Sequence, residues 1–294
     1  MKSKIIPLSD PGYSDLLRNI YDPPKELNIW GEFPNFNEHP PIAIVGSRKP
    51  TDYGRQNAHD IAGALAKAGF TIISGLAYGI DSAAHRGCLK AGGVTLAIVG
   101  SGLDKIYPDS HKELAEEIVK KGGAVISEFK DGTPPLAYNF PIRNRIVTGM
   151  SLGVIVIEAA IDSGSLISAR LAMEQGREVF AVPGAIGNIN TAGTHRLIRE
   201  GAALIESAQD VIDILDARLS AAWKTKFSGQ SFGIGDRERK LLNFLTNAPQ
   251  QMDELIEKTG FKANEAASML TMLEISGLIR EADGRGYIKL KTHD

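Results

Sequence analysis

The segment PPIAIVGSRKPTDYG, residues 40–54, joins a short apolar run to a turn made of Gly46, Ser47 and Arg48. The run predicts a buried strand, and a glycine directly after such a strand often lets a phosphate approach the backbone. The dinucleotide-binding pattern G-x-G-x-x-G is absent, and Arg48 stands where its second glycine would be. The segment therefore indicates an anion site at a strand end, built around a guanidinium.

Similar apolar runs recur from this segment to about residue 207 and alternate with helical stretches. Near-continuous Val, Ile and Ala runs are typical of parallel strands buried on both faces. The alternation predicts an α/β domain with an extended Rossmann-like, doubly wound parallel sheet. The expected strands are 42–46, 70–76, 94–100, 124–128, 152–160, 178–184 and 203–207, and the expected helices are 53–69, 80–93, 111–123, 165–176, 194–202 and 208–220.

Changes in composition divide the 294 residues into four segments: a short N-terminal extension (1–40), a Rossmann-like domain (41–220), a Gly/Ser-rich linker (221–235) and a C-terminal unit (236–294). The extension is Pro-rich, with one short helix and an edge strand near residues 25–32. The last unit has three helical stretches and two strands joined at Asp283-Gly284, which is the order of a winged helix.

Charge and cysteine content limit the functional classes. The formal net charge is −2, so any anion site must be local. Residues 236–294 carry nine Lys/Arg against ten Asp/Glu, which argues against a transcription factor built on the winged helix. One cysteine, Cys88, excludes an internal disulfide and indicates a cytoplasmic protein. The chain shows no membrane segment, no metal-binding cluster and no nucleophile elbow, so we expect neither metal nor cofactor nor covalent catalysis.

Candidate residues follow the other predicted strands as well. The segment SGLAYGID supplies Ser74, Gly75, Gly79 and Asp81, although tight turns need glycine with or without a ligand. Asp81 is better explained as a helix N-cap than as a catalytic acid. The segment 163–165, Ser-Gly-Ser, offers N–H donors at a helix start, and its serines are equally plausible as caps. Glu158 could orient loop N–H groups or act as a base.

The segment NFPIRNRIVTG, residues 139–149, places an aromatic residue and two arginines within six positions. Arginines that match phosphate oxygens, beside a ring that stacks on a base, are the usual means of holding single strands. The alternative is that Phe140 and Pro141 pack inward while Arg143 and Arg145 make surface ion pairs. Residue types alone leave both open.

Taken together, GSR (46–48), SGLAYGID (74–81), FPIRNR (140–145), SGSLISARLAMEQGR (163–177) and VPG (182–184) closely resemble the motifs of the bacterial DprA/Smf family. The resemblance implies a non-enzymatic protein that binds single-stranded DNA without sequence preference, forms a dimer and helps load a RecA-type recombinase in natural transformation. Arg48, Arg143 and Arg145 would then contact phosphates, and Phe140 would stack on a base. The implied DNA-binding residues are Gly46, Ser47, Arg48, Ser74, Gly75, Gly79, Phe140, Arg143, Asn144, Arg145, Ser163, Gly164 and Ser165.

The resemblance also implies a dimer contact near residues 194–207. Leu197 and Ile198 lie on a short predicted helix, and Leu204 lies on the following strand at the sheet margin. An apolar margin strand needs a cover, which a two-fold partner could provide. The alternative cover is the helix 208–220 of the same chain.

Two features depart from the family pattern. Many members have a larger N-terminal helical domain than the forty residues found here. Some also have a lysine after Tyr107-Pro108, where this chain has Asp109.

A phosphoribohydrolase of the LOG type is the alternative function, since those enzymes also place a small-residue loop and a glutamate at a Rossmann-like edge. Their P-G-G-x-G-T loop is absent, and the comparable segment is IDSGSLISARLAME.

Overall fold

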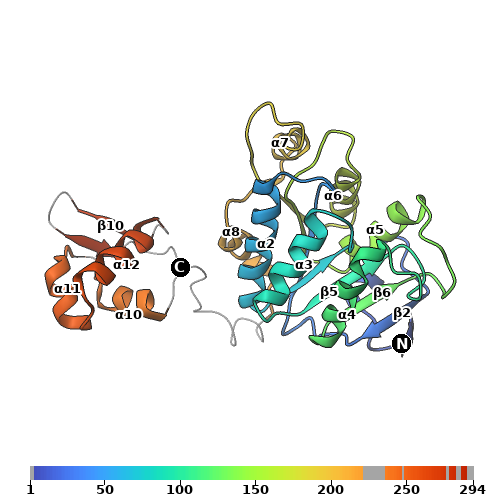
Figure 1. Cartoon of the computed structure of the whole chain (residues 1–294), viewed down its shortest axis with the longest axis horizontal. Coiled ribbons are helices and arrows are strands. Elements are labelled where there is room, and N and C mark those ends of the chain that lie inside the picture. The colour runs from blue at the N-terminus through green and yellow to red at the C-terminus, as the bar shows by residue number, and fades with distance from the viewer. Residues whose placement is uncertain (1–2, 221–235, 247, 276–277, 283–285, 290–294) are drawn as a thin grey trace. The chain divides into compact units, whose positions relative to one another are not determined.

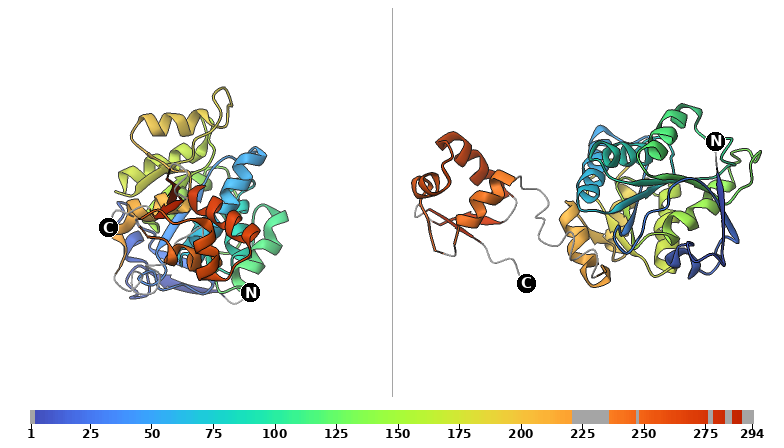
Figure 2. Two further views of the ribbon diagram at one scale, coloured as in Figure 1. Left: turned by 90° about the vertical axis from the view of Figure 1, so that its left-hand side faces the viewer. Right: turned by 90° about the horizontal axis from the view of Figure 1, so that it is seen from below.

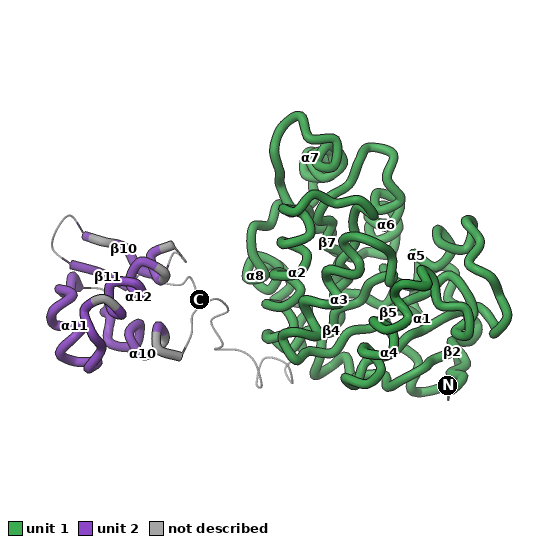
Figure 3. The backbone as a smooth tube through the Cα atoms, in the orientation of Figure 1, with its two compact units in different colours: residues 1–230 green, residues 231–294 purple. Residues whose placement is uncertain are grey.

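The computed structural model describes residues 3–220, 236–246, 248–275, 278–282 and 286–289 (Figure 1). The chain forms two compact units, Met1–Gln230 and Ser231–Asp294, which are described separately below (Figure 3). The predicted linker, 221–235, lies outside the described residues.

The first unit is built on a single nine-stranded sheet with the order β1-β2-β6-β5-β4-β3-β7-β8-β9. All neighbours from β6 to β9 are parallel, whereas β2 pairs antiparallel with both β1 and β6. This confirms the predicted α/β class. The strands are β1 (Lys4–Pro7), β2 (Glu26–Gly31), β3 (Pro41–Val45), β4 (Thr71–Ser74), β5 (Thr95–Val99), β6 (Ala124–Ser127), β7 (Gly153–Val156), β8 (Glu178–Ala181) and β9 (Ala203–Leu204).

Helices cover both faces of the sheet (Figure 2). The central strands β3 to β7 are buried at every position, as expected for a sheet covered on both sides. Helices α2, α3 and α4 pack next to one another on one face, and α5 and α6 pack together on the other. The helices are α1 (Asp15–Arg18), α2 (Asp52–Lys67), α3 (Ile80–Lys90), α4 (Lys112–Lys120), α5 (Asn139–Gly149), α6 (Gly164–Glu174), α7 (Ala192–Arg199) and α8 (Ala208–Leu215).

The first forty residues belong to the same sheet as the rest of the unit. The segment expected as an edge strand is β2, but it lies between β1 and β6, so the edge is formed by β1. Leu27 and Ile29 of β2 are buried in the main core, so this strand is an integral part of the sheet. The extension is therefore part of the scaffold that supports the carboxyl edge of β6.

Helix α5 is absent from the sequence-based prediction, which places no helix between the fourth and fifth strands. Pro141 stands in the first turn of α5, where a missing N–H costs nothing because that N–H has no helical partner. Ile146 and Val147 bury the far end of the helix in the core. The helix therefore holds its N-terminal half, with Phe140 and Arg143, at the sheet edge.

The second unit confirms the predicted winged helix. It contains α10 (Asp236–Phe244), α11 (Met252–Thr259), α12 (Ala263–Ile275), β10 (Ile279–Glu281) and β11 (Tyr287–Lys289), with the two strands antiparallel. Leu241, Leu255, Leu270 and Leu273 form its core. No helix in the described part of either unit is long and apolar enough to cross a membrane.

Candidate functional site

The candidate site is a groove at the carboxyl edge of the sheet, where β3 and β7 lie side by side. Chain connections leave these two strands in opposite directions, toward β4 and toward β8, which is where open α/β sheets bind ligands. The loops are joined by a hydrogen bond of 2.7 Å from Ser47 N to Glu158 O. The groove has a volume of about 860 Å³ and is lined by Val45, Gly46, Ser47, Arg48, Lys49, Ala77, Asp81, Tyr107, Pro135, Ala137, Phe140, Pro141, Arg143, Asn144, Ala160, Ser163, Gly164, Ser165, Ile167, Ser168 and Asn190.

Among Arg48, Arg143 and Arg145, the three arginines predicted to contact phosphate, only Arg48 is exposed. Its guanidinium carbon lies over the Phe140 ring, 5.2 Å from the centroid, and the side chain is exposed. Neither Arg48 nor its neighbour Lys49 pairs with a carboxylate within the described residues. Two uncompensated positive charges therefore face the groove beside an aromatic ring.

The Gly46 turn packs tightly against Ile80 and the Glu158 backbone. A Cβ at Gly46 would lie 2.6 Å from the Ile80 side chain, so only glycine fits there. Glu158 is fully buried, and its carboxylate accepts hydrogen bonds from Thr51 N (2.9 Å) and Thr51 Oγ1 (2.5 Å) at the start of α2. Of the two roles considered for Glu158, the structure supports the orientation of loop N–H groups.

Asp81 closes the loop after β4 instead of capping a helix. The N-cap of α3 is Gly79, so the predicted capping role of Asp81 is wrong. The buried Asp81 carboxylate accepts hydrogen bonds from Gly75 N (3.0 Å) and Ala77 N (3.3 Å). Burial raises the pKa of the Asp81 carboxyl, while the guanidinium of Arg143 and these N–H donors oppose the shift.

Arg143 lies beneath the groove with its side chain buried. Its Nη1 donates to Ile98 O at 2.5 Å, and Nε has no hydrogen-bond partner among the described residues. Burial lowers the pKa of Arg143 to about 10, and the Asp81 carboxylate opposes that shift. A Cβ at Gly75 would lie 1.8 Å from Nη1, so that glycine makes room for the guanidinium. Arg143 thus adds positive charge from below rather than an exposed phosphate contact.

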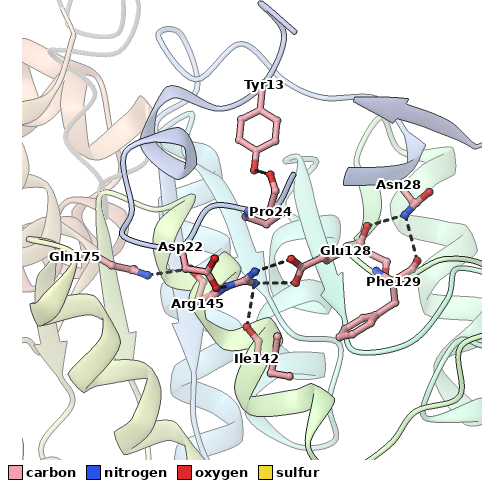
Figure 4. Close-up of polar contacts among 10 residues, drawn as sticks. Tyr13, Asp22, Pro24, Asn28, Glu128, Phe129, Ile142, Arg145 and Gln175 are labelled. Atoms are coloured by element: carbon pink, nitrogen blue, oxygen red, sulfur yellow. Dashed lines mark hydrogen bonds and ion pairs between the residues drawn. The ribbon is translucent and has the colours of Figure 1, made fainter. Parts of the chain in front are cut away.

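Arg145 is bound by carboxylates outside the groove (Figure 4). Its Nη2 and Nη1 donate to the two oxygens of Glu128 at 2.6 and 2.9 Å, and its Nε donates to Asp22 at 3.2 Å. The ion pairs with Glu128 and Asp22 raise the pKa of Arg145 against the opposing effect of burial. Asp22 belongs to the N-terminal extension, within which the Tyr13 hydroxyl donates to Pro24 O. The expectation that Arg145 contacts phosphate is thus corrected.

The far wall of the groove is the N-terminus of α6. Ser163 is its N-cap, because its Oγ accepts from Ser165 N at 3.2 Å. The first-turn N–H groups of an eleven-residue helix carry partial positive charge. This end of α6 therefore adds to the attraction of Arg48 and Lys49 for an anion.

The structure brings together nine of the thirteen predicted DNA-binding residues. Ser74, Gly75, Gly79 and Arg145 do not line the groove. Ser74 donates to Ile44 O, and Gly79 begins α3 with a positive φ of 79°. The residues in the groove are Gly46, Ser47, Arg48, Phe140, Arg143, Asn144, Ser163, Gly164 and Ser165.

Sequence reasoning missed Lys49, Tyr107 and Asn190 in the groove wall. Lys49 directly follows the Arg48 motif, and Tyr107 follows the third predicted strand, so position after a strand was an available signal for both. Asn190 follows the predicted strand 178–184 in the same way, and a 3.1 Å hydrogen bond from its side chain to Lys49 O places it in the wall.

The predicted dimer residues differ in their exposure. Leu197 is buried in the core of its own chain, which corrects its assignment to a contact surface. Ile198 packs partly against the same core. Leu204 lies on the edge strand β9 and is 48% exposed, so α8, which packs against α2, leaves it uncovered.

Comparison with known protein families identifies the family to which this chain belongs. The family model of DNA recombination-mediator protein A matches residues 4–216, and that of the DprA winged helix domain matches residues 233–285. The chain belongs to the DNA recombination-mediator protein A family. The resemblance inferred from GSR, FPIRNR and the other motifs is thereby confirmed.

Relatives in this family match both the sequence and the fold. Protein Smf of Escherichia coli (strain K12) is 40% identical over 293 residues, which is 98% of this chain and 77% of the relative. The X-ray structure of DNA processing protein A from Streptococcus pneumoniae is 42% identical, with a TM-score of 0.67 over 72% of this chain and 74% of that one. DNA processing protein A from Helicobacter pylori, described for its single-stranded DNA binding mode, is 30% identical, with a TM-score of 0.66 over 74% and 97%.

Proposed function

We propose that this chain binds single-stranded DNA, independently of base sequence, in the groove at the carboxyl edge of its sheet. The observation that carries the proposal is the exposed guanidinium of Arg48, free of carboxylates among the described residues and held over an aromatic ring beside the N-terminus of α6. A fixed cation, helix N–H groups and a ring are the parts that grip a sugar-phosphate chain and its bases. The binding mode described for the relative from Helicobacter pylori supports the same ligand.

Each wall of the groove has a role in this proposal. Arg48 and Lys49 bind backbone phosphates, and the Gly46 turn lets one phosphate approach the main chain. The N–H of Gly164, in the first turn of α6, donates to a further phosphate. Arg143 strengthens the potential from beneath, where low dielectric makes its charge more effective.

The proposed role is binding without catalysis. In a phosphoribohydrolase, Glu158 would be the candidate base. Its carboxylate is fully buried and accepts two hydrogen bonds from Thr51 at the start of α2. Asp81, a residue that lines the groove, accepts hydrogen bonds from loop N–H groups instead. The alternative of a phosphoribohydrolase is therefore not favoured.

The family assignment supports partners beyond DNA. A recombination mediator passes a bound strand to a recombinase, so we include a RecA-type recombinase as partner and natural transformation as the process. We also propose that the chain forms a homodimer through the edge strand β9, where the exposed Leu204 supports a contact. The buried Cys88 is consistent with a reducing cytoplasm as the site of action.

A gel-shift comparison tests the proposed function. The full chain is titrated against a single-stranded oligonucleotide and the matching duplex across a salt series, with oligo-dT and oligo-dA as probes of sequence preference. We expect tighter binding to the single strand, similar affinity for both homopolymers and weaker binding as salt rises. Equal affinity for duplex, or cleavage of a nucleoside monophosphate in a parallel assay, would contradict the proposal.

A further inference from the structure

A second hollow, the cup, lies between the first turn of α2 and the loop that joins β8 to α7 (Figure 1). The cup has a volume of about 580 Å³. Among the residues that the structure describes, none with a charged side chain lines it. The cup therefore suits the neutral, apolar part of a ligand and not a phosphate. Its lining residues are Thr51, Tyr53, Pro183, Gly184, Ala185, Asn188 and Thr191.

Tyr53 gives the cup an aromatic surface that is held in place. The residue is 51% exposed and lies in the first turn of α2, and its hydroxyl donates to Pro183 O at 3.0 Å. This hydrogen bond ties the tyrosine to the opposite wall, so little side-chain freedom is lost when a ligand stacks on the ring. A half-exposed ring beside an apolar hollow is a stacking surface for a flat ligand.

Asn188 gives the cup a hydrogen-bond donor. Its side-chain oxygen accepts from Asn190 N at 2.9 Å, while its amide nitrogen has no hydrogen-bond partner in the described part of the chain. Each of the four nucleobases has an acceptor on its edge, so this donor can serve any of them. A ring surface and one unselective donor are what a site for any base requires.

The cup and the candidate groove border the same two chain segments. Lys49 lines the groove, and Thr51, two positions later, lines the cup. Asn190 likewise lines the groove, and Asn188 lines the cup. A hydrogen bond of 3.1 Å from Asn190 Nδ2 to Lys49 O joins the two segments. A cationic groove on one side and an uncharged cup on the other match the alternation of phosphate and base along a single strand.

We propose that the cup receives a base of the single strand whose phosphates lie in the groove, and that this base stacks on Tyr53. The inference rests on the proposed single-strand function and adds to it a second contact, outside the groove. Stacking tolerates every base, so the contact raises affinity without sequence preference. Ile186, 96% exposed in the same loop, would also suit an apolar protein surface, but the shared border with the groove favours the base.

Photochemical cross-linking of the wild-type chain locates the base directly. A single-stranded oligonucleotide that carries 5-iododeoxyuridine in place of thymidine is bound, irradiated and digested, and the cross-linked peptides are identified by mass spectrometry. We expect a cross-link on the peptide that contains Tyr53, and its loss when excess unmodified single strand competes. Cross-links on peptides of the groove without one at Tyr53 would overturn the inference.

Two variants test the cup by affinity. Tyr53→Ala removes the ring, and Ala185→Leu fills the cup without changing a residue of the groove. On a normal single strand we expect both to weaken binding, Tyr53→Ala by about 5- to 150-fold, the range of one lost base–aromatic stack. On the same strand with abasic sites throughout, both variants should bind like the wild type, because no base is present to stack. Tyr53→Phe, which keeps the ring, should bind both strands like the wild type.

Tyr21→Ala and Ile186→Ala are the matched controls. Tyr21 is a fully exposed tyrosine that lines neither the groove nor the cup, and Ile186 shares the loop of Ala185 without lining the cup. Neither change should alter the affinity for either strand. An Ile186→Ala loss as large as that of Tyr53→Ala would assign the contact to the outer surface of the loop and overturn the inference.

The outcomes separate this inference from the proposed function. If Arg48→Ala weakens single-strand binding while Tyr53→Ala and Ala185→Leu do not, the cup holds no base and the proposed function stands. The same conclusion follows if the cup variants weaken binding to abasic DNA equally. It also follows if they change the sedimentation of the chain without DNA, which would make the cup a contact between copies. If the wild-type protein does not prefer single strands, the proposed function fails first and this inference fails with it.

Discussion

Replacing Arg145 by alanine should lower the stability of the first unit and leave its DNA affinity intact. The guanidinium is 14% exposed and binds Glu128, 24% exposed, through two hydrogen bonds of 2.6 and 2.9 Å. Breaking a fully buried pair costs about 3–5 kcal/mol, because it leaves an unpaired buried charge. Since Glu128 retains some access to water, we expect about 2–3 kcal/mol from this pair.

The second partner contributes little to that estimate. Asp22 is 74% exposed, so its pair with Arg145 contributes about 0–1 kcal/mol. A loss of about 2–3 kcal/mol should lower the melting temperature by about 4–12 °C, at roughly 2–4 °C per kcal/mol for a unit of this size.

The assay pairs thermal melting by circular dichroism with single-strand titration at a temperature where both proteins are folded. A double variant with Glu128→Ala should be destabilised by less than the sum of the two single variants, because both remove the same interaction. An Arg145→Ala protein with the wild-type melting temperature and weakened DNA binding would refute this assignment. It would restore Arg145 as a phosphate ligand.

Three other predictions follow from the same structure. Arg48→Ala should weaken single-strand binding and reduce the slope of log affinity against log salt by about 0.7, with an unchanged melting temperature; an unchanged slope would remove Arg48 from the phosphate contacts. Burial lowers the pKa of His85 to about 3, below its unfolded value of about 6.5, so the unfolded chain takes up the proton first. The contribution of His85 to the free energy of unfolding should therefore be complete above about pH 6.5 and should fall toward pH 3, by up to about 1.4 kcal/mol per pH unit. In His85→Asn, the free energy of unfolding measured with urea should change less with pH over this window. Leu204→Glu should give a folded monomer in sedimentation, whereas an unaltered dimer would place the contact elsewhere.

Most of the scaffold was predictable from local patterns. Every predicted strand from 42–46 to 203–207 overlaps an observed one, because strands buried on both faces leave continuous apolar runs in the sequence. Helix α5 escaped prediction because Pro141 and two arginines obscure a helix whose buried end lies at Ile146 and Val147. Strand β2 was recognised as an edge strand, but its place inside the sheet depends on pairing with β6, about a hundred residues later.

The groove, like the scaffold, could be predicted only in part. Its position could be predicted, since the carboxyl ends of parallel strands share one edge and small residues follow each of them. The roles of its arginines could not be predicted. Arg48, Arg143 and Arg145 all stand in loop-like, polar motifs, and residue type does not distinguish a free guanidinium from a paired one.

The sequence by itself therefore determined the layers, the winged helix and the sheet edge that carries the candidate groove, because these follow from periodicities within short segments. Only the tertiary structure decided which charge faces the groove. Arg145 meets Asp22, 123 positions away, and Arg143 meets the Ile98 carbonyl, 45 positions away, only after the sheet has assembled. Arg48 remains available because, among the described residues, folding brings a ring to its guanidinium and no carboxylate. A guanidinium is neutralised or left free by the groups that packing places around it, and those groups are distant in the chain.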